Sequence, residues 1–159
     1  MLEKYLKKEN IILGLPPKNK WQILEILTRI YCKNVPDKVK DEIFLSVLSR
    51  EIKLSTGLSG SVAIPHGRCK LVNEIGLLFC KFDTPIDWES IDNQKTNFVF
   101  LVISPEEATD EYLKLLSDIS KMISRKVLKK ALLSAKTKEQ VYKLIINAKI
   151  RKTKRKKII

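Results

Sequence analysis

The sequence predicts an α/β fold, with a single layered domain in which a mixed sheet of about five strands is flanked by helices on both faces. A continuous apolar run at residues 98–103 is typical of a central strand that is covered on both sides. Segments with helical periodicity precede and follow this run, so helices are available to cover both faces. The chain has 159 residues, of which 44% are hydrophobic, and this suits one domain with one core.

The N-terminal third is expected to contain a short strand and two helices. Residues 11–13 are apolar and precede Gly14 and two prolines, which favour a turn. From residue 19, apolar side chains recur at helical spacing and predict a helix that ends near residue 33. Pro36 suits the first turn of a second helix, which should run to Arg50 or Glu51. Arg50 would then stand at a helix C-terminus and face the following loop.

The rest of the chain predicts two strands followed by three helices. The expected elements are strands at residues 74–82 and 97–103, helices at about 106–124 and 127–132, and a last helix that begins near residue 138. The first of these strands has β-branched and aromatic content and should end at Thr84-Pro85. Thr137 and Gln140 have the spacing of a capping box, which predicts the start of the last helix.

Positive charge is concentrated at the C-terminus. Of the 31 lysines and arginines, seven lie in residues 149–159, where there is no acidic residue, and the whole chain carries +13. We expect a domain at residues 1–148 followed by a flexible basic tail at residues 149–159. Such a tail would suit an anionic partner, whether nucleic acid, lipid or protein. Nucleic acid is disfavoured, because the sequence shows neither a helix-turn-helix pattern nor basic residues interleaved with aromatic ones.

Several classes of protein are disfavoured by composition. The run at residues 98–103 is far shorter than the roughly 20 residues of a transmembrane helix, and the charged N-terminus lacks the apolar region of a signal peptide, so a cytoplasmic location is expected. Cys32, Cys69 and Cys80 are odd in number and lack C-x-x-C spacing, which predicts reduced thiols. With one histidine and no cysteine cluster, we predict neither a metal site nor a cofactor.

His66 is the only histidine and the strongest candidate for a reactive group. It follows Pro65 and precedes Gly67, a setting that presents an imidazole at the end of a short strand with open backbone beyond it. A neutral imidazole with a pKa near 6.5 is a nucleophile toward phosphorus at neutral pH. We therefore predict that His66 is phosphorylated.

Cations and hydroxyls near His66 in the sequence are the groups that stabilise a transferring phosphoryl group. Arg50 and Arg68 are the candidate cations, and Ser55 and Thr56 are the candidate hydroxyl donors. An alternative for Arg50 is a surface arginine that interacts with the C-terminus of its own helix. Trp88 is expected to serve in packing.

The motifs Arg50-Glu51, Thr56-Gly57 and Ala63-Ile64-Pro65-His66-Gly67, at these separations, resemble the IIA proteins of bacterial sugar phosphotransferase systems. The branch is the mannitol/fructose type, which includes the nitrogen-regulatory IIA proteins, and the resemblance covers nearly the whole chain. It implies the same α/β architecture and a phosphotransferase with a phosphohistidine intermediate. The phosphoryl group would come from a histidine-containing phosphocarrier protein to Nε2 of His66.

Two routes onward from His66 are implied by this resemblance. In the transport branch the phosphoryl group passes to a IIB protein or domain, whose acceptor is a cysteine. In the regulatory branch the phosphorylation state is read by a partner protein, and the phosphoryl group does not pass to sugar. The stand-alone length favours the second route slightly.

The chain departs from the family pattern at two places. Ser59 and Ser61 fill positions that usually carry glycine, while Gly60 falls where a non-glycine residue is common, so a different loop path is expected. Tyr112 stands where many members have a second histidine. Its spacing with apolar residues of the same predicted helix also allows the interpretation that Tyr112 is a core aromatic.

Overall fold

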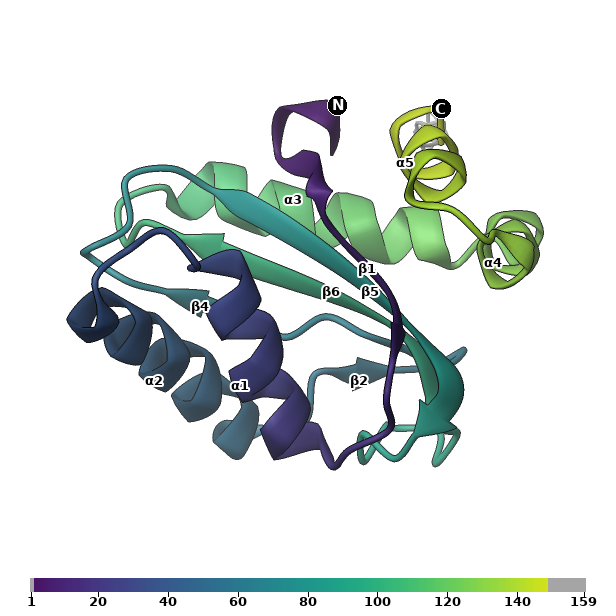
Figure 1. Cartoon of the computed structure of the whole chain (residues 1–159), viewed down its shortest axis with the longest axis horizontal. Helices are drawn as coiled ribbons and strands as arrows, with labels where there is room; N and C mark the ends of the chain where they lie inside the picture. Colours follow the sequence, from purple (N-terminus) through teal and green to yellow (C-terminus); the bar gives the residue numbers. More distant parts are fainter. Residues whose placement is uncertain (1, 149–159) are drawn as a thin grey trace, which may run out of the picture.

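A six-stranded mixed sheet forms the centre of the structure, a computed structural model that describes residues 2–148 (Figure 1). The strand order is β1-β5-β6-β3-β2, and β4 also pairs with β6. The bounds are β1 (Leu6–Leu15), β2 (Gly57–Leu58), β3 (Val62–Ala63), β4 (His66–Arg68), β5 (Gly76–Ile86) and β6 (Thr96–Ser104). The pair β5 and β6 is antiparallel, whereas β1 runs parallel to β5, and both β3 and β4 run parallel to β6.

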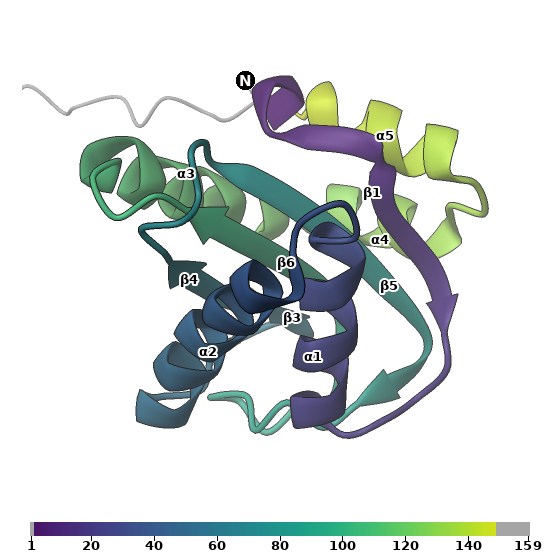
Figure 2. The same ribbon diagram turned by 60° about the vertical axis from the view of Figure 1, so that its left-hand side comes forward.

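Helices cover both faces of this sheet (Figures 1 and 2). They are η1 (Leu2–Lys4), α1 (Lys20–Tyr31), α2 (Asp37–Lys53), α3 (Thr109–Ile123), α4 (Lys126–Ser134) and α5 (Lys138–Ile146). The pair α1 and α2 packs on one face, and α3, α4 and α5 pack on the other, where α5 also contacts β1. The predicted α/β layered architecture is confirmed.

The central strand β6 shows why both faces need cover. Phe98, Phe100 and Val102 point into the core beneath α3 to α5, whereas Val99 and Leu101 point into the core beneath α1 and α2. Successive side chains of a strand point to opposite faces, so a continuous apolar run can be satisfied only between two layers. All of these side chains are buried.

Two helices begin where the sequence predicts. Asn19 caps α1 and Thr137 caps α5, and in each case a glutamine three residues later bonds back to the cap residue. The predicted capping box at Thr137 is confirmed. Helix α2 continues to Lys53, slightly beyond the predicted end, so Arg50 lies in its last turn.

Two predicted strand ends were wrong. Strand β1 extends well beyond residues 11–13, because an edge strand tolerates the exposed polar residues that precede them. Strand β5 continues through Pro85 to Ile86. A proline is accommodated there because the pairing of β5 with β6 is irregular between Lys81 and Ile86, where the missing N–H is not needed.

The three cysteines are buried free thiols, as predicted. Among residues 2–148, no helix combines the length and the apolar character that a membrane crossing requires. The predicted basic tail, residues 149–159, lies outside the described residues.

Candidate functional site

His66 opens strand β4, and the pairing of this strand fixes its position. His66 lies opposite Val102 of β6, and the Val102 N–H donates to the carbonyl of Pro65 at 3.0 Å. The imidazole Nδ1 lies 2.7 Å from the Ile64 carbonyl oxygen. A carbonyl can only accept a hydrogen bond, so Nδ1 must carry the proton and Nε2 keeps its lone pair.

The protonation state of His66 follows from its surroundings. Burial lowers the pKa of His66 below its usual 6.5, because a charged imidazolium loses hydration in the fold. The bond to the Ile64 carbonyl opposes this effect, and the positive charge of Arg50 adds to it. The imidazole is therefore neutral at pH 7, with a nucleophilic Nε2.

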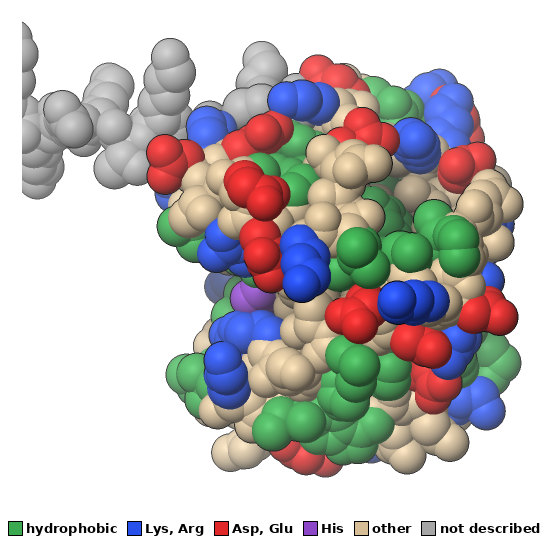
Figure 3. All heavy atoms as spheres, turned by 90° about the vertical axis from the view of Figure 1, so that its left-hand side faces the viewer, with side chains coloured by type: hydrophobic (Ala, Val, Ile, Leu, Met, Phe, Trp, Pro, Cys, Tyr) green, Lys and Arg blue, Asp and Glu red, His purple; other side chains and the backbone are tan. Residues whose placement is uncertain are grey.

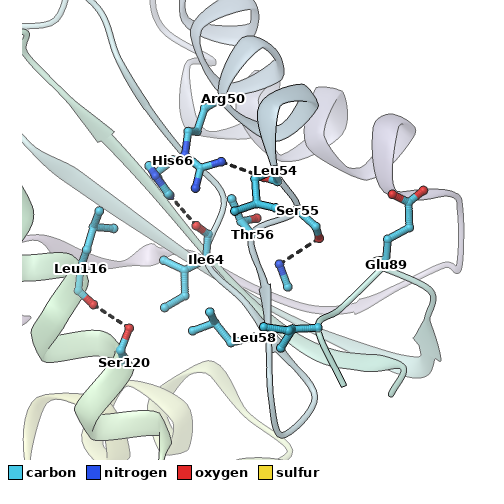
Figure 4. Close-up of a pocket in the computed structure, with 12 residues that line it drawn as sticks. Arg50, Leu54, Ser55, Thr56, Leu58, Ile64, His66, Glu89, Leu116 and Ser120 are labelled. Atoms are coloured by element: carbon cyan, nitrogen blue, oxygen red, sulfur yellow. Dashed lines mark hydrogen bonds between the residues drawn. The ribbon is translucent and has the colours of Figure 1, made fainter. Parts of the chain in front are cut away.

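His66 and Arg50 line a cavity of about 360 Å³ (Figure 4). The space-filling view shows the histidine in a recess next to lysine or arginine side chains (Figure 3). Most of the other lining side chains are apolar, and they come from the end of α2, the β2–β3 region, the loop after β5 and α3: Leu54, Leu58, Ile64, Ile91 and Leu116. Electrostatic interactions with a bound anion are strengthened where such walls exclude water.

Arg50 projects from the last turn of α2 toward this cavity (Figure 4). Its Nη1 donates at 2.7 Å to the carbonyl oxygen of Leu54, the C-cap residue that follows α2. The interaction with its own helix end, considered as an alternative from the sequence, is therefore present. It does not exclude a role at His66, because a guanidinium carries five N–H donors in a rigid fork.

Ser55 and Thr56 line the cavity, but their hydroxyls already have protein partners. Ser55 Oγ donates to the Trp88 carbonyl at 2.8 Å and accepts from the Gly57 N–H at 3.2 Å. Thr56 Oγ1 donates to Glu51 Oε2 at 2.5 Å. Their predicted role as hydrogen-bond donors to a phosphoryl group would require these hydroxyls to turn away from their present partners.

Arg68 and Tyr112 flank His66 outside the cavity that Arg50 lines. The Tyr112 ring meets the His66 ring edge to face, with the centroids 5.8 Å apart, and the Arg68 guanidinium lies 5.7 Å from the Tyr112 centroid. Arg68 also donates to the Glu106 carbonyl and to Thr109 Oγ1, at the start of α3. Tyr112 is thus both a core aromatic and a direct neighbour of His66. Burial raises the pKa of Tyr112 to about 12, so its hydroxyl stays neutral.

The loop between β2 and β3 contains an unusual backbone. Gly60 has φ 84° and Ser61 has φ 68°, so a serine adopts the left-handed conformation that favours glycine. The Gly60 N–H donates to Asp92, and Lys129 donates to the Gly60 carbonyl. These two contacts hold the turn that contains Ser59, Gly60 and Ser61.

Glu51 is a site residue whose importance the sequence reasoning missed. Its carboxylate is buried and accepts bonds from Thr56 and from Trp88, which lies in the core as predicted. A signal was present in the sequence, because Ile43, Val47 and Glu51 recur every four residues. This spacing places the carboxylate on the buried stripe of α2.

The fold and the cavity define an α/β domain that presents one neutral histidine beside an arginine. Residues 4–148 match the family described as "Phosphoenolpyruvate-dependent sugar phosphotransferase system, EIIA 2". The chain belongs to this family, and the resemblance found in the sequence is confirmed.

Known proteins from both branches are similar to this chain. A "Nitrogen regulatory protein" of Pseudomonas aeruginosa is 29% identical over 146 residues, which is 92% of this chain and 95% of that protein. The nitrogen regulatory protein IIA-Ntr from Neisseria meningitidis has a TM-score of 0.84 at 25% identity, with 91% of this chain and 98% of that chain covered. A chain in the complex of mannitol IIA with phosphorylated mannitol IIB from Escherichia coli shares the fold, with a TM-score of 0.75 at 20% identity. The match covers 89% of this chain and 96% of that chain.

Proposed function

We propose that this protein is a phosphocarrier that accepts a phosphoryl group on Nε2 of His66. The observation that carries the proposal is the 2.7 Å contact of Nδ1 with the Ile64 carbonyl, because it leaves Nε2 unprotonated in a neutral ring. The proposed donor is a histidine-containing phosphocarrier protein. Both proteins would work in the cytoplasm, where phosphoenolpyruvate supplies the phosphoryl group.

The proposed transfer needs no further reactant. The lone pair of His66 Nε2 forms a bond to phosphorus while the N–P bond of the donor histidine breaks and returns its electron pair to the donor nitrogen. Negative charge spreads over three equatorial oxygens in this loose transition state. Arg50, which already lowers the pKa of His66 through its charge, is the cation in position to stabilise them. Ser55 and Thr56 would assist only after rearrangement of their present bonds. Arg68 keeps further N–H donors but lies outside the cavity, so it would have to approach His66 to assist.

The proposed acceptor of the phosphoryl group is a cysteine of a IIB protein. The mannitol IIA structure in complex with phosphorylated IIB shares this fold, which supports the assignment. A second candidate is a regulatory IIA, whose phosphorylation state controls a partner without sugar transport. It is favoured by the similarity to nitrogen regulatory proteins over more than nine tenths of the chain.

Phosphorylation of His66 is tested by intact mass spectrometry. The protein is incubated with phosphoenolpyruvate, the first phosphotransferase enzyme and the phosphocarrier protein. We expect addition of one acid-labile phosphoryl group that is absent in His66→Ala and present in Cys69→Ser, a control three residues away. A folded wild-type protein that takes up no phosphoryl group from competent cognate donors would refute the proposal.

The phosphorylated protein also separates the two routes onward. Transport predicts that the phosphoryl group leaves His66 for a cysteine of a IIB protein from the same organism and then reaches sugar. Regulation predicts that the phosphoryl group stays on His66 and that a cellular partner distinguishes the phosphorylated protein from the unphosphorylated one.

A further inference from the structure

A buried carboxylate joins the segments that surround His66. The Glu51 side chain is fully buried, and that of Lys20, its ionic partner at 3.1 Å, is 4% exposed. Glu51 Oε1 also accepts from the Thr56 N–H at 3.0 Å and from Trp88 Nε1 at 3.1 Å, while Oε2 accepts from Thr56 Oγ1. Four donors from three other segments therefore converge on one side chain of α2.

A continuous series of hydrogen bonds leads from this carboxylate to the imidazole. Glu51 binds both the N–H and the hydroxyl of Thr56, and the Thr56 carbonyl accepts from the Ile64 N–H at 3.1 Å. The Ile64 carbonyl in turn accepts from His66 Nδ1 at 2.7 Å. The Ile64 carbonyl, which fixes the tautomer of His66, thus belongs to a segment that is bonded to Thr56, and Glu51 fixes Thr56 in place.

We propose that Glu51 is a positioning residue for phosphoryl transfer, which fixes the Nδ1–H tautomer and the orientation of His66 through Thr56 and Ile64. Lys20 serves as the counter-ion that allows a carboxylate to be buried at this point. The oxygen that accepts from the Thr56 N–H holds the backbone of this segment, and the second oxygen accepts from the Thr56 hydroxyl. Burial of a charge pair is costly, so a buried pair bonded to the segment that orients His66 points to a role in geometry.

The tautomer is measured first in the unmodified protein. Because His66 is the only histidine, ¹⁵N-histidine labelling gives the signals of a single imidazole. We expect a predominant Nδ1–H form, together with slow hydrogen exchange at the Thr56 and Ile64 amides. A predominant Nε2–H form would overturn the inference before any variant is made.

Two matched double variants then separate positioning from stability. Lys20→Met with Glu51→Leu removes both charges and the acceptor, whereas Lys20→Met with Glu51→Gln removes the charges but keeps a carbonyl oxygen at Thr56. We expect the leucine variant to lose the predominance of Nδ1–H and to accept phosphoryl groups at least about tenfold more slowly, by analogy with the loss of a group that orients a metal-binding histidine. The glutamine variant should keep the tautomer and most of the rate.

Equal behaviour of the two folded double variants, in tautomer and in rate, would overturn the inference. If the leucine variant does not fold, Glu51→Asp replaces it, because the shorter carboxylate keeps the charge but retracts from Thr56. An unchanged tautomer and rate in a folded Glu51→Asp protein would then overturn the inference. Only the kinetic measurement rests on the proposed function. If no protein is phosphorylated but the tautomer follows the variants as expected, the proposed function fails, whereas the role of Glu51 in fixing the tautomer and orientation of His66 stands.

Discussion

At the scale of single residues, the chemistry of this site depends on which nitrogen of His66 holds the proton. A surface histidine samples both tautomers and is partly charged near neutral pH. Here the Ile64 carbonyl selects Nδ1–H, and burial together with Arg50 keeps the ring neutral. The unprotonated Nε2 thus results from the position of the ring, because the Ile64 carbonyl holds the proton on Nδ1.

The lowered pKa of His66 makes two pH-dependent effects measurable. The rate of phosphoryl uptake should fall only as the pH drops through the folded pKa, below 6.5. Stability should also fall on acidification, because the unfolded chain binds a proton near pH 6.5 that the folded state resists. This loss begins near the unfolded pKa and levels off below the folded one.

Urea unfolding and NMR titration test these expectations. The drop in unfolding free energy from about pH 7.5 to about pH 5.5 should be smaller in His66→Gln than in the wild type. A His66 pKa measured above 6.5, or an equal drop in the two proteins, would contradict the expectation.

Tyr112 offers a second test at residue scale, because the resemblance predicts that it stands where many IIA proteins have a second histidine. Tyr112→His introduces a group that can become cationic beside His66, so phosphoryl uptake should accelerate severalfold or depend more steeply on pH near 6 to 7. Tyr112→Phe keeps the ring contacts with His66 and Arg68, and its effect should be mild. If Tyr112→His matches the wild type in rate and pH profile, the residue has only its structural role.

At the scale of elements, the contact between α2 and β4 brings Arg50 to His66. A Cβ at Gly67 would collide with Ser46 Oγ and lie 2.8 Å from the Val47 backbone nitrogen, so a glycine is required for this approach. Helix α2 carries Arg50 and Glu51, and β4 carries His66. The separation of these two elements therefore sets the geometry of the site.

Gly67→Ala should separate α2 from β4 and impair transfer. Overpacking costs about 1 to 3 kcal/mol of stability, and a displacement of about 1 Å at a reacting group can slow the reaction about 100-fold. Gly76→Ala is the matched control for overpacking, because its Cβ would collide with Tyr31 of α1 and not with α2. Comparable transfer rates per folded molecule in the two variants would show that this contact does not control the site.

At the scale of the whole molecule, the sheet separates two hydrophobic cores, and each core supports different residues of the site. The core under α1 and α2 supports the segments that carry Arg50, Glu51 and Trp88, whereas the core under α3 to α5 supports Tyr112. The strand β6 belongs to both, so His66, which pairs with it, is held between two packed layers.

Truncation after Ala148 tests the predicted organisation of the whole chain. Seven positive charges without interspersed acids repel one another and should favour an open, hydrated segment, so their removal should leave the melting temperature and phosphorylation of His66 nearly unchanged. Binding to anionic vesicles or acidic proteins should weaken and lose its dependence on salt. A large drop in melting temperature would place the domain boundary beyond residue 148.

The sequence by itself determined the layered fold, the central strand and the capped helices, and it predicted His66 as the reactive group. These features follow from local patterns: an apolar run, helical spacing, a capping pair and one histidine in a recognisable motif. The boundaries of β1 and β5 could not be predicted from these patterns. Strand β1 lies at the edge of the sheet and β5 pairs irregularly with β6, and both settings tolerate residues that usually end strands.

Only the tertiary structure decided how the site residues act. Glu51 meets Trp88 across 37 positions, and the strand that begins at His66 takes its place from pairing with β6, so neither relation has a local signal. The same packing gives the hydroxyls of Ser55 and Thr56 hydrogen-bond partners within the protein and places the Tyr112 ring in contact with the His66 ring. Hydrogen-bond partners and protonation states depend on contacts between distant segments, and these exist only once the two layers have closed on the sheet.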